Sequence, residues 1–289
     1  MRNMIRRMSL LMAVLLAAAF TAALAEDAWN PDEEYSFADI IGMDIITYND
    51  VPWNFPVDMM EMEPDLVLLV NKEMFLSKDY VPEDLVTMKS LKLDSEGNNT
   101  NGGVRRTNSG MELRRECAEA LAKLCDAARA EGHELYLKSA YRSYRTQDTM
   151  YYNRLKQYGY DDGWVTKPGA SDHQTGLGCD VVPKNWTDRG MNENMAKEEE
   201  TQWMAEHCAE FGFILRYPKD KEDITQINYE PWHLRYVGIP VATYIMENGL
   251  CLEEFYEQLQ AAINEFIAAG GPKSLVEDFI QVSAVDKYD

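Results

Sequence analysis

The feature that most limits how this chain can fold is one ten-residue stretch, Ser171-Asp172-His173-Gln174-Thr175-Gly176-Leu177-Gly178-Cys179-Asp180. It places His173 and Asp180 seven positions apart, with two glycines between them. Glycine adopts positive φ values and tolerates close backbone approach, so the chain can leave a loop at His173, turn, and enter a strand at Cys179. We therefore predict that His173 and Asp180 converge on one point. Together they are two of the three protein ligands that a catalytic zinc site requires.

A second segment, Tyr229-Glu230-Pro231-Trp232-His233-Leu234, offers the third ligand. Residues three apart face opposite sides of a straight strand, so Glu230 and His233 point the same way only if Pro231 introduces a bend. With that bend, His233 completes the zinc site and Glu230 lies beside the metal as a general base. Trp232 would help to keep the site dry. The alternative is an ordinary strand whose Glu and His are exposed.

The chain has only two other histidines, and neither has the surroundings of a ligand. His133 follows Gly132, which we expect to end a helix, and a cation is favourable at that helix end. His207 shares a predicted helix with Trp203 and Phe211. We interpret both histidines as structural.

A zinc site with a general base is typical of a hydrolase. A hydrolase of this design also needs a cation that polarises the scissile carbonyl and holds the developing oxyanion. The segment 138–147 supplies candidates at a predicted strand-to-helix junction. Arg142 is our choice for this cation. Ser139 and Gln147 are candidates for binding a substrate carboxylate or amide, whereas Arg145 is expected to face solvent.

Hydrophobic periodicity predicts helices and strands that mix without βαβ regularity and without internal repeats. This mixture favours an α+β fold with a mainly antiparallel sheet flanked by helices. The expected strands lie at 66–70, 134–139 and 213–215, with an extended segment at 227–236. The expected helices lie at 111–130, about 144–158 after an N-cap at Ser143, 197–211, 241–247 and 252–269.

The first 25 residues combine a basic start, an apolar run from Met8 to Leu24 and the small-x-small sequence Ala23-Leu24-Ala25. This pattern predicts a secretory signal peptide cleaved after Ala25, with an uncleaved membrane anchor as the alternative. We divide the remainder into an acidic, loosely packed extension (26–62), a domain that carries the predicted zinc site (63–250) and a C-terminal helical extension (251–289). The mature protein is expected outside the cell.

Cleavage would leave 25 basic and 49 acidic residues, a net charge of −24. So acidic a protein is expected to avoid nucleic acid and anionic membrane surfaces. We expect a monomer. The five cysteines include no C-x-x-C pair and their number is odd, so they do not indicate a disulfide framework. Cys179 is expected to point away from Asp180, to the opposite face of its strand.

The stretch from Ser171 to Asp180 resembles the S-x-H-x-x-G-x-A-x-D signature of VanY-type zinc D-alanyl-D-alanine carboxypeptidases. This family belongs to a wider group with lysostaphin-like enzymes and the Hedgehog signalling domain. Three further segments match in order and spacing, so that the resemblance covers roughly Leu66 to Gly238: Ser139-Ala140-Tyr141-Arg142-Ser143, Gly212-Phe213-Ile214-Leu215-Arg216-Tyr217-Pro218 and Glu230-Pro231-Trp232-His233. One departure is Gly178, where the family usually has alanine; we expect it to loosen the turn without removing a ligand.

The resemblance implies zinc in a sheet-lined cleft, bound by His173, Asp180 and His233. It also implies that Glu230 acts as the base and that Arg142 contacts the substrate carbonyl. The implied activity is that of an exported zinc D,D-carboxypeptidase, which removes the terminal D-Ala from peptidoglycan stem peptides. The resemblance thus implies that residues 63–250 are a zinc peptidase domain and that the mature protein lies outside the bacterial cell or is associated with its wall.

Three alternatives remain beside that activity. Relatives include L,D-carboxypeptidases and peptidoglycan endopeptidases, and Hedgehog-like relatives make a catalytically silent, zinc-containing wall-binding module conceivable. A serine hydrolase built on Ser171 is disfavoured because the chain has no Gly-x-Ser-x-Gly elbow. We expect Ser171 to shape the loop or, with Trp232, to contact substrate.

Overall fold

The computed structural model describes residues 46–280. The predicted signal peptide and residues 26–45 of the predicted acidic extension lie outside the described residues. Among the residues described, none of the helices has the length and apolarity needed to span a bilayer.

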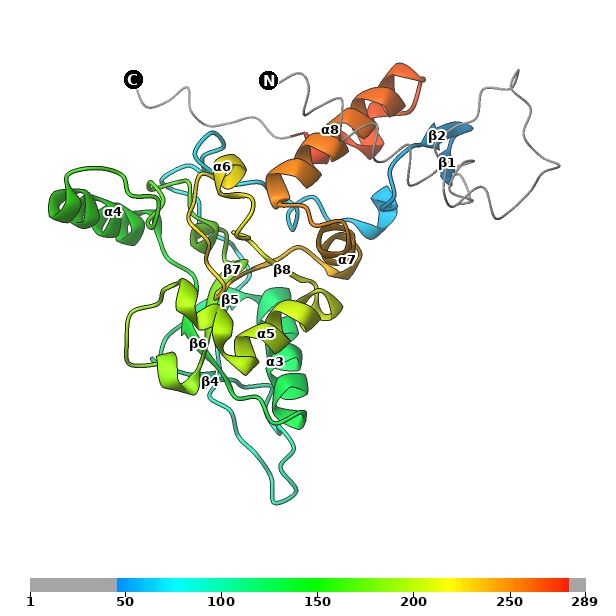
Figure 1. The fold of residues 1–289 in the computed structure, drawn as a ribbon. Helices are drawn as coiled ribbons and strands as arrows, with labels where there is room; N and C mark the ends of the chain where they lie inside the picture. The colour runs from blue at the N-terminus through cyan, green and yellow to red at the C-terminus, as the bar shows by residue number, and fades with distance from the viewer. Residues whose placement is uncertain (1–45, 281–289) are drawn as a thin grey trace, which may run out of the picture. The chain divides into compact units, whose positions relative to one another are not determined.

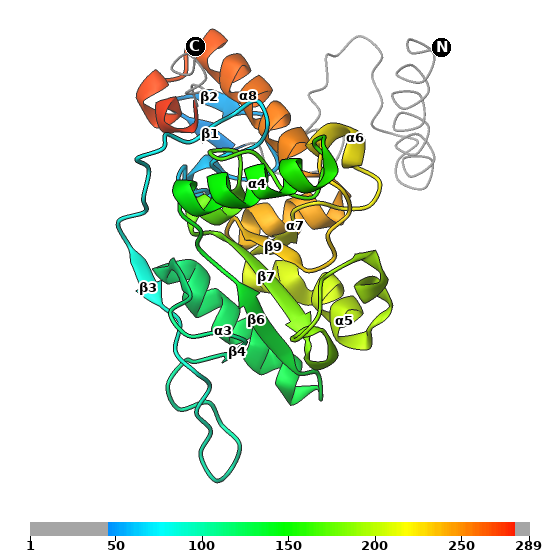
Figure 2. The same ribbon diagram turned by 90° about the vertical axis from the view of Figure 1, so that its left-hand side faces the viewer.

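A five-stranded sheet forms the centre of the protein (Figures 1 and 2). Only the pairing of its first two strands is parallel; the other three pairings are antiparallel. The prediction of an α+β fold with a mainly antiparallel sheet is therefore confirmed. In spatial order the strands are β4 (Arg105–Arg106), β6 (Leu135–Ser139), β7 (Gly178–Pro183), β9 (His233–Tyr236) and β8 (Phe213–Leu215).

One face of the sheet packs on helices α3 (Arg115–Ala130) and α5 (Glu199–His207). The pleat points alternate residues to this face, among them Leu137, Cys179 and Leu234. Asp180 directly follows Cys179 and His233 directly precedes Leu234, so both face the other way. Cys179 has no exposed surface, as expected for a small apolar residue, and the chain's five cysteines are all free and buried.

Helix α3 begins four residues later than the hydrophobic periodicity predicts. Glu112–Arg114 forms strand β5, which pairs with β3 (Leu85–Thr87) in a separate two-stranded sheet. Backbone pairing with β3 thus takes precedence over the helical pattern at Met111 and the residues after it. The predicted helix 197–211 is likewise divided, into α5 and the 3-10 turn η5 (Cys208–Phe211).

Helix α4 (Tyr144–Tyr158) follows β6 and begins where the sequence predicts. The hydroxyl of Ser143 accepts a hydrogen bond from the backbone N–H of Thr146, which satisfies one of the free donors at the helix start. Gly159 then ends α4 in a left-handed conformation, φ 82°. The remaining short elements are η1 (Met59–Glu61), η2 (Asp172–Thr175), η3 (Lys184–Trp186), η4 (Glu193–Lys197), α6 (Glu222–Thr225), η6 (Lys273–Leu275) and η7 (Glu277–Phe279).

A second hydrophobic core lies beyond the sheet. It joins hairpin β1–β2 (Ile46–Tyr48, Val51–Trp53) to helices α7 (Ile239–Glu247) and α8 (Leu252–Ala268), which Figure 1 shows beside each other. Trp53 and Phe55 are buried and make edge-to-face contacts with rings of α8. The expectation that residues up to 62 pack loosely is therefore wrong for residues 46–62, since their aromatic side chains are part of this core.

The buried segment 66–70 is not a strand, contrary to prediction. Instead, the guanidinium of Arg235 donates to the carbonyls of Leu66 and Leu68, and that of Arg216 donates to the carbonyl of Val70. Because side chains satisfy these backbone acceptors, an apolar run can be buried here in an irregular conformation.

Candidate metal centre

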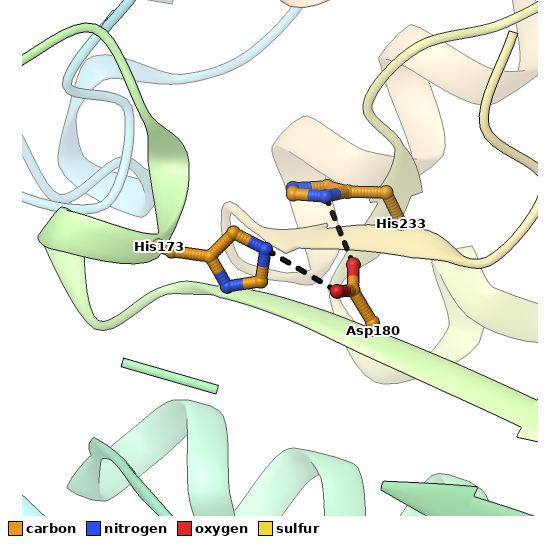
Figure 3. A group of neighbouring side chains, drawn as sticks. All are labelled: His173, Asp180 and His233. Carbon is orange, nitrogen blue, oxygen red and sulfur yellow. Dashed lines mark ion pairs between the residues drawn. The ribbon is translucent and has the colours of Figure 1, made fainter. Parts of the chain in front are cut away.

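His173, Asp180 and His233 meet on the sheet face opposite α3 and α5 (Figure 3). One possible ligand atom from each lies within 4.8 Å of the others. Asp180 stands between the imidazoles: its Oδ2 lies 3.5 Å from His173 Nε2, and its Oδ1 lies 3.2 Å from His233 Nδ1. Strand pairing positions two of the three, since Asp180 on β7 is directly opposite His233 on β9. The three side chains thus converge as the spacing predicts.

His173 reaches the cluster from η2, the turn before β7. Its Nδ1 lies 2.8 Å from the carbonyl oxygen of Ala140, an acceptor that holds the proton on Nδ1 and leaves the Nε2 lone pair facing Asp180. Gly176 ends the turn with φ 70°, a conformation that favours glycine.

Gly178 has a different role from the one its sequence suggests. A Cβ atom at this position would lie 2.9 Å from both the carbonyl carbon and the Cβ of Asp172. The glycine therefore lets η2 pack closely against β7. Close packing, and not the loosening that we expected, is the consequence of a glycine where the family usually has alanine.

The bend predicted at Pro231 is present. The backbone N–H of His233 donates to the carbonyl of Glu230 at 3.1 Å, which closes a turn immediately before β9. Glu230 therefore lies on the same side as His233, with its Oε2 3.5 Å from His233 Nδ1. Both side chains are buried.

The electrostatics of the cluster are those of buried acids around two imidazoles. Burial and the nearby Arg142 lower the pKa of His173, which is therefore neutral at pH 7. Burial opposes ionisation of Asp180, but the two histidines hold its pKa well below the usual range. Burial lowers the pKa of His233, but the adjacent carboxylates of Asp180 and Glu230 outweigh burial and raise this pKa to about 10. A cation bound here would take the place of that proton.

Two polar atoms of the cluster have no hydrogen-bond partner although they are buried: Asp180 Oδ1 and His233 Nε2. Such atoms are rare in folded proteins, and where they occur a bound ion or water commonly satisfies them. Two imidazoles and one carboxylate are a donor set that zinc accepts. The residues present fit a zinc ion.

Arg142 lines the same cleft as the cluster, partly buried. Its Nη1 donates to Gln147 Oε1 at 2.7 Å and its Nη2 to Ser139 Oγ at 3.2 Å. Gln147 is buried, and its amide nitrogen donates to the carbonyl of Thr166. In this geometry Ser139 and Gln147 hold Arg142 in place. Direct contact of either with substrate stays a prediction.

The cleft has a volume of about 380 Å³, within the range of pockets that bind small ligands. Ser171 and Trp232 both line it. The indole of Trp232 stacks on that of Trp164, with ring centroids 6.1 Å apart. This pair forms an apolar wall beside the polar cluster, and Met191 lines the cleft as well.

Sequence reasoning missed Tyr217 and Trp164. The Tyr217 ring lies 4.9 Å from the His233 ring, and its hydroxyl donates to Asp172 at 3.3 Å. Tyr217 lies two residues after strand β8, and an aromatic residue close to a strand end beside a predicted site was an available signal. Trp164 lies in the loop before the ten-residue stretch, and nothing local distinguishes it.

Residues 110–239 match the model of the VanY family, described as D-alanyl-D-alanine carboxypeptidase. The chain is 36% identical to YodJ, a protein of Bacillus subtilis (strain 168) provisionally assigned as a carboxypeptidase. That alignment covers 74% of this chain and 75% of YodJ.

Solved structures agree with this match. The LD-carboxypeptidase LdcB is similar with a TM-score of 0.56 and 36% identity, over 74% of this chain and 93% of that one. A vancomycin-resistance D,D-pentapeptidase VanY, solved in complex with Zn(II), is similar with a TM-score of 0.50 and 33% identity. The match covers 66% of this chain and 98% of the VanY chain.

Proposed function

We propose that this chain, which belongs to the VanY family of D-alanyl-D-alanine carboxypeptidases, is an exported zinc-dependent D,D-carboxypeptidase that removes the terminal D-Ala from peptidoglycan stem peptides. The observation that carries the proposal is the convergence of His173, Asp180 and His233, with Glu230 beside them, in one cleft. The family match and the zinc-bound VanY structure support the same activity.

His173, Asp180 and His233 would hold the zinc. Bound there, zinc lowers the pKa of a water molecule to about 7 and polarises a carbonyl. The other chemistry belongs to side chains of this protein. Glu230 would take a proton from the attacking water and deliver it to the leaving amine of D-Ala. Burial raises its pKa, so the carboxylate is a stronger base than in water.

Arg142 would stabilise the negative charge that develops on the carbonyl oxygen. Its guanidinium is held by Gln147 and Ser139, so little reorganisation is needed when that charge appears. Trp232 and Trp164 wall the cleft and limit water on that side.

Specificity for an L,D bond is the second candidate. It is favoured by the likeness to LdcB, an LD-carboxypeptidase of which the chain covers 93%. The two activities differ in the residue on the amino side of the scissile bond. A pentapeptide ending in D-Ala-D-Ala and a tetrapeptide ending in a single D-Ala distinguish them.

The test is to incubate purified residues 26–289 with each peptide, with and without a chelator. Release of one D-Ala from the pentapeptide alone supports the D,D assignment, and release from the tetrapeptide alone supports L,D specificity. Chelation should abolish release and added zinc should restore it. A zinc-loaded, folded protein that cleaves neither peptide would contradict the proposal and favour a silent wall-binding module.

Export is proposed from the leader pattern of residues 1–25. Mass spectrometry of protein from the culture fluid should find an N-terminus at Glu26. An N-terminus at Met1 on a cell-associated protein would favour the uncleaved anchor instead.

A further inference from the structure

A second cluster of buried charge adjoins the metal centre and contains Asp172, Arg216, Arg235 and Glu253. Asp172 and both arginines have no exposed surface, and Glu253 is 7% exposed. The four residues come from η2, the end of β8, strand β9 and helix α8. Two positive and two negative charges balance one another.

Arg216 links helix α8 to the turn that carries His173. Its Nη1 and Nη2 donate to the two carboxylate oxygens of Glu253 at 2.8 and 2.7 Å. Its Nε donates to Asp172 Oδ2 at 2.7 Å. A two-pronged pairing of guanidinium with carboxylate fixes direction as well as distance, so Glu253 determines where Arg216 points.

Asp172 passes this constraint to the metal centre. Arg235 donates to its Oδ1, and Arg216 and the hydroxyl of Tyr217 donate to its Oδ2. Asp172 directly precedes His173, and Arg235 lies two residues after His233. The backbone on which both histidines stand is thus tied to this one carboxylate.

We propose that Glu253 is a positioning residue of the metal centre, acting through Arg216 and Asp172 on the turn that carries His173. Helix α8 then belongs to the structure that holds the ion, although Glu253 lies beyond residues 110–239 that match the family model. The inference rests on the proposed zinc site.

The physical reason is charge balance in a buried place. Without the Glu253 carboxylate, two guanidinium groups share the single carboxylate of Asp172. A buried charge without its partner is costly, so Arg216 and Asp172 are expected to shift to reduce that cost. Groups that hydrogen-bond a metal ligand typically contribute about 10- to 100-fold to metal affinity; because Glu253 acts through Arg216 and Asp172, we expect a loss near the lower end of that range.

The experiment compares Glu253→Gln with Glu254→Gln in residues 26–289. Glu254 is the matched control: it lies on the same turn of α8 and pairs with Lys221 at 2.9 Å, which is not among the partners of Asp172. Zinc Kd is measured by competition with a chromophoric chelator, and kcat and KM at saturating zinc. Glu253→Gln should weaken zinc binding at least about tenfold and lower kcat with KM within about twofold. Glu254→Gln should leave all three within about twofold of the unmodified protein.

A folded Glu253→Gln protein with wild-type zinc Kd would overturn the inference. If that variant does not fold, Glu253→Asp provides the measurement, since it keeps the charge but is too short for both contacts. Weaker zinc binding by Glu253→Asp supports the inference, and unchanged binding contradicts it. The zinc Kd needs no substrate, so a failure of the proposed peptidase activity is seen separately.

Discussion

The protein buries two charged clusters side by side, and they differ in how completely their polar atoms are paired. In the Asp172–Arg216–Arg235–Glu253 cluster, both carboxylates accept from guanidinium groups on each of their oxygens. In the His173–Asp180–His233 cluster, Asp180 Oδ1 and His233 Nε2 lack a hydrogen-bond partner.

This difference in pairing distinguishes a cluster that stabilises the fold from one that could bind an ion. Burial of charge alone does not indicate a functional site, since paired charges serve to hold segments together. A bound ion can satisfy buried polar atoms that lack a protein partner, and in the His173–Asp180–His233 cluster the two such atoms belong to two of the proposed zinc ligands. The two clusters use neighbouring residues: Asp172 directly precedes His173 in η2, and Arg235 lies two residues after His233 in β9. A proposed zinc ligand and a residue that holds its backbone are therefore at most two positions apart.

The largest effect is expected from His173→Ala. Removing a ligand from a three-ligand site should lower zinc affinity and activity together, and each by more than the roughly 100-fold that loss of a group behind a ligand can cause. Zinc content after dialysis and peptide cleavage report the two losses. A His173→Ala protein that retains stoichiometric zinc would show that this assignment of ligands is wrong.

Arg216→Met breaks the paired cluster and should act on stability. It leaves Asp172 and Glu253 buried without this partner, a situation that typically costs about 3–5 kcal/mol. Denaturant unfolding of the metal-free protein measures the loss. Arg129→Met is the control, because Arg129 pairs with Asp126 near the surface, where such pairs contribute about 0–1 kcal/mol. Equal losses of unfolding free energy in the two variants would show that the buried pairing of Arg216 contributes no more than a pair near the surface.

Glu230→Ala should separate binding of the ion from its use. The three ligands remain, so zinc content should be unchanged, while removal of a general base lowers kcat by at least about a hundredfold. Near-normal turnover would refute the role of Glu230 as base. Loss of zinc by this variant would instead place Glu230 among the ligands.

The sequence predicts the His173–Asp180–His233 cluster but not the cluster around Arg216, and the reason is physical. His173 and Asp180 lie within one turn-and-strand unit, and the bend at Pro231 is local, so spacing is informative. Strand Phe213–Leu215 was predicted with its correct bounds for the same reason. The pairing of Arg216 with Glu253 joins residues 37 apart and leaves no local period.

The segment 66–70 also shows that local sequence does not reveal long-range partners. Its apolar run predicts a strand, and hydrophobic pattern alone says nothing of what its carbonyls will pair with. Arg235, 169 residues from Leu66 in the sequence, provides that pairing. Trp53 likewise reaches its aromatic partner Phe266 only through the tertiary fold. Contacts of this kind require the three-dimensional structure.

The smallest effect concerns pH. At Glu230, activity and stability are expected to depend on pH in opposite directions. Burial raises the pKa of Glu230 above its ordinary 4.5, although His233 opposes this. A base must be deprotonated, so kcat/KM of the zinc-loaded protein should fall about tenfold per pH unit below the pKa that Glu230 has beside the ion.

For the metal-free protein, stability depends on pH in the opposite direction. The folded state binds this proton more tightly than the unfolded state, so the stability contributed by Glu230 is full below its ordinary pKa of 4.5 and is lost as pH rises through the raised value. Activity and stability should therefore change in opposite directions across this window, and Glu230→Ala should remove both dependences. An acid limb that Glu230→Ala leaves unchanged would show that Glu230 is not the base whose titration limits activity.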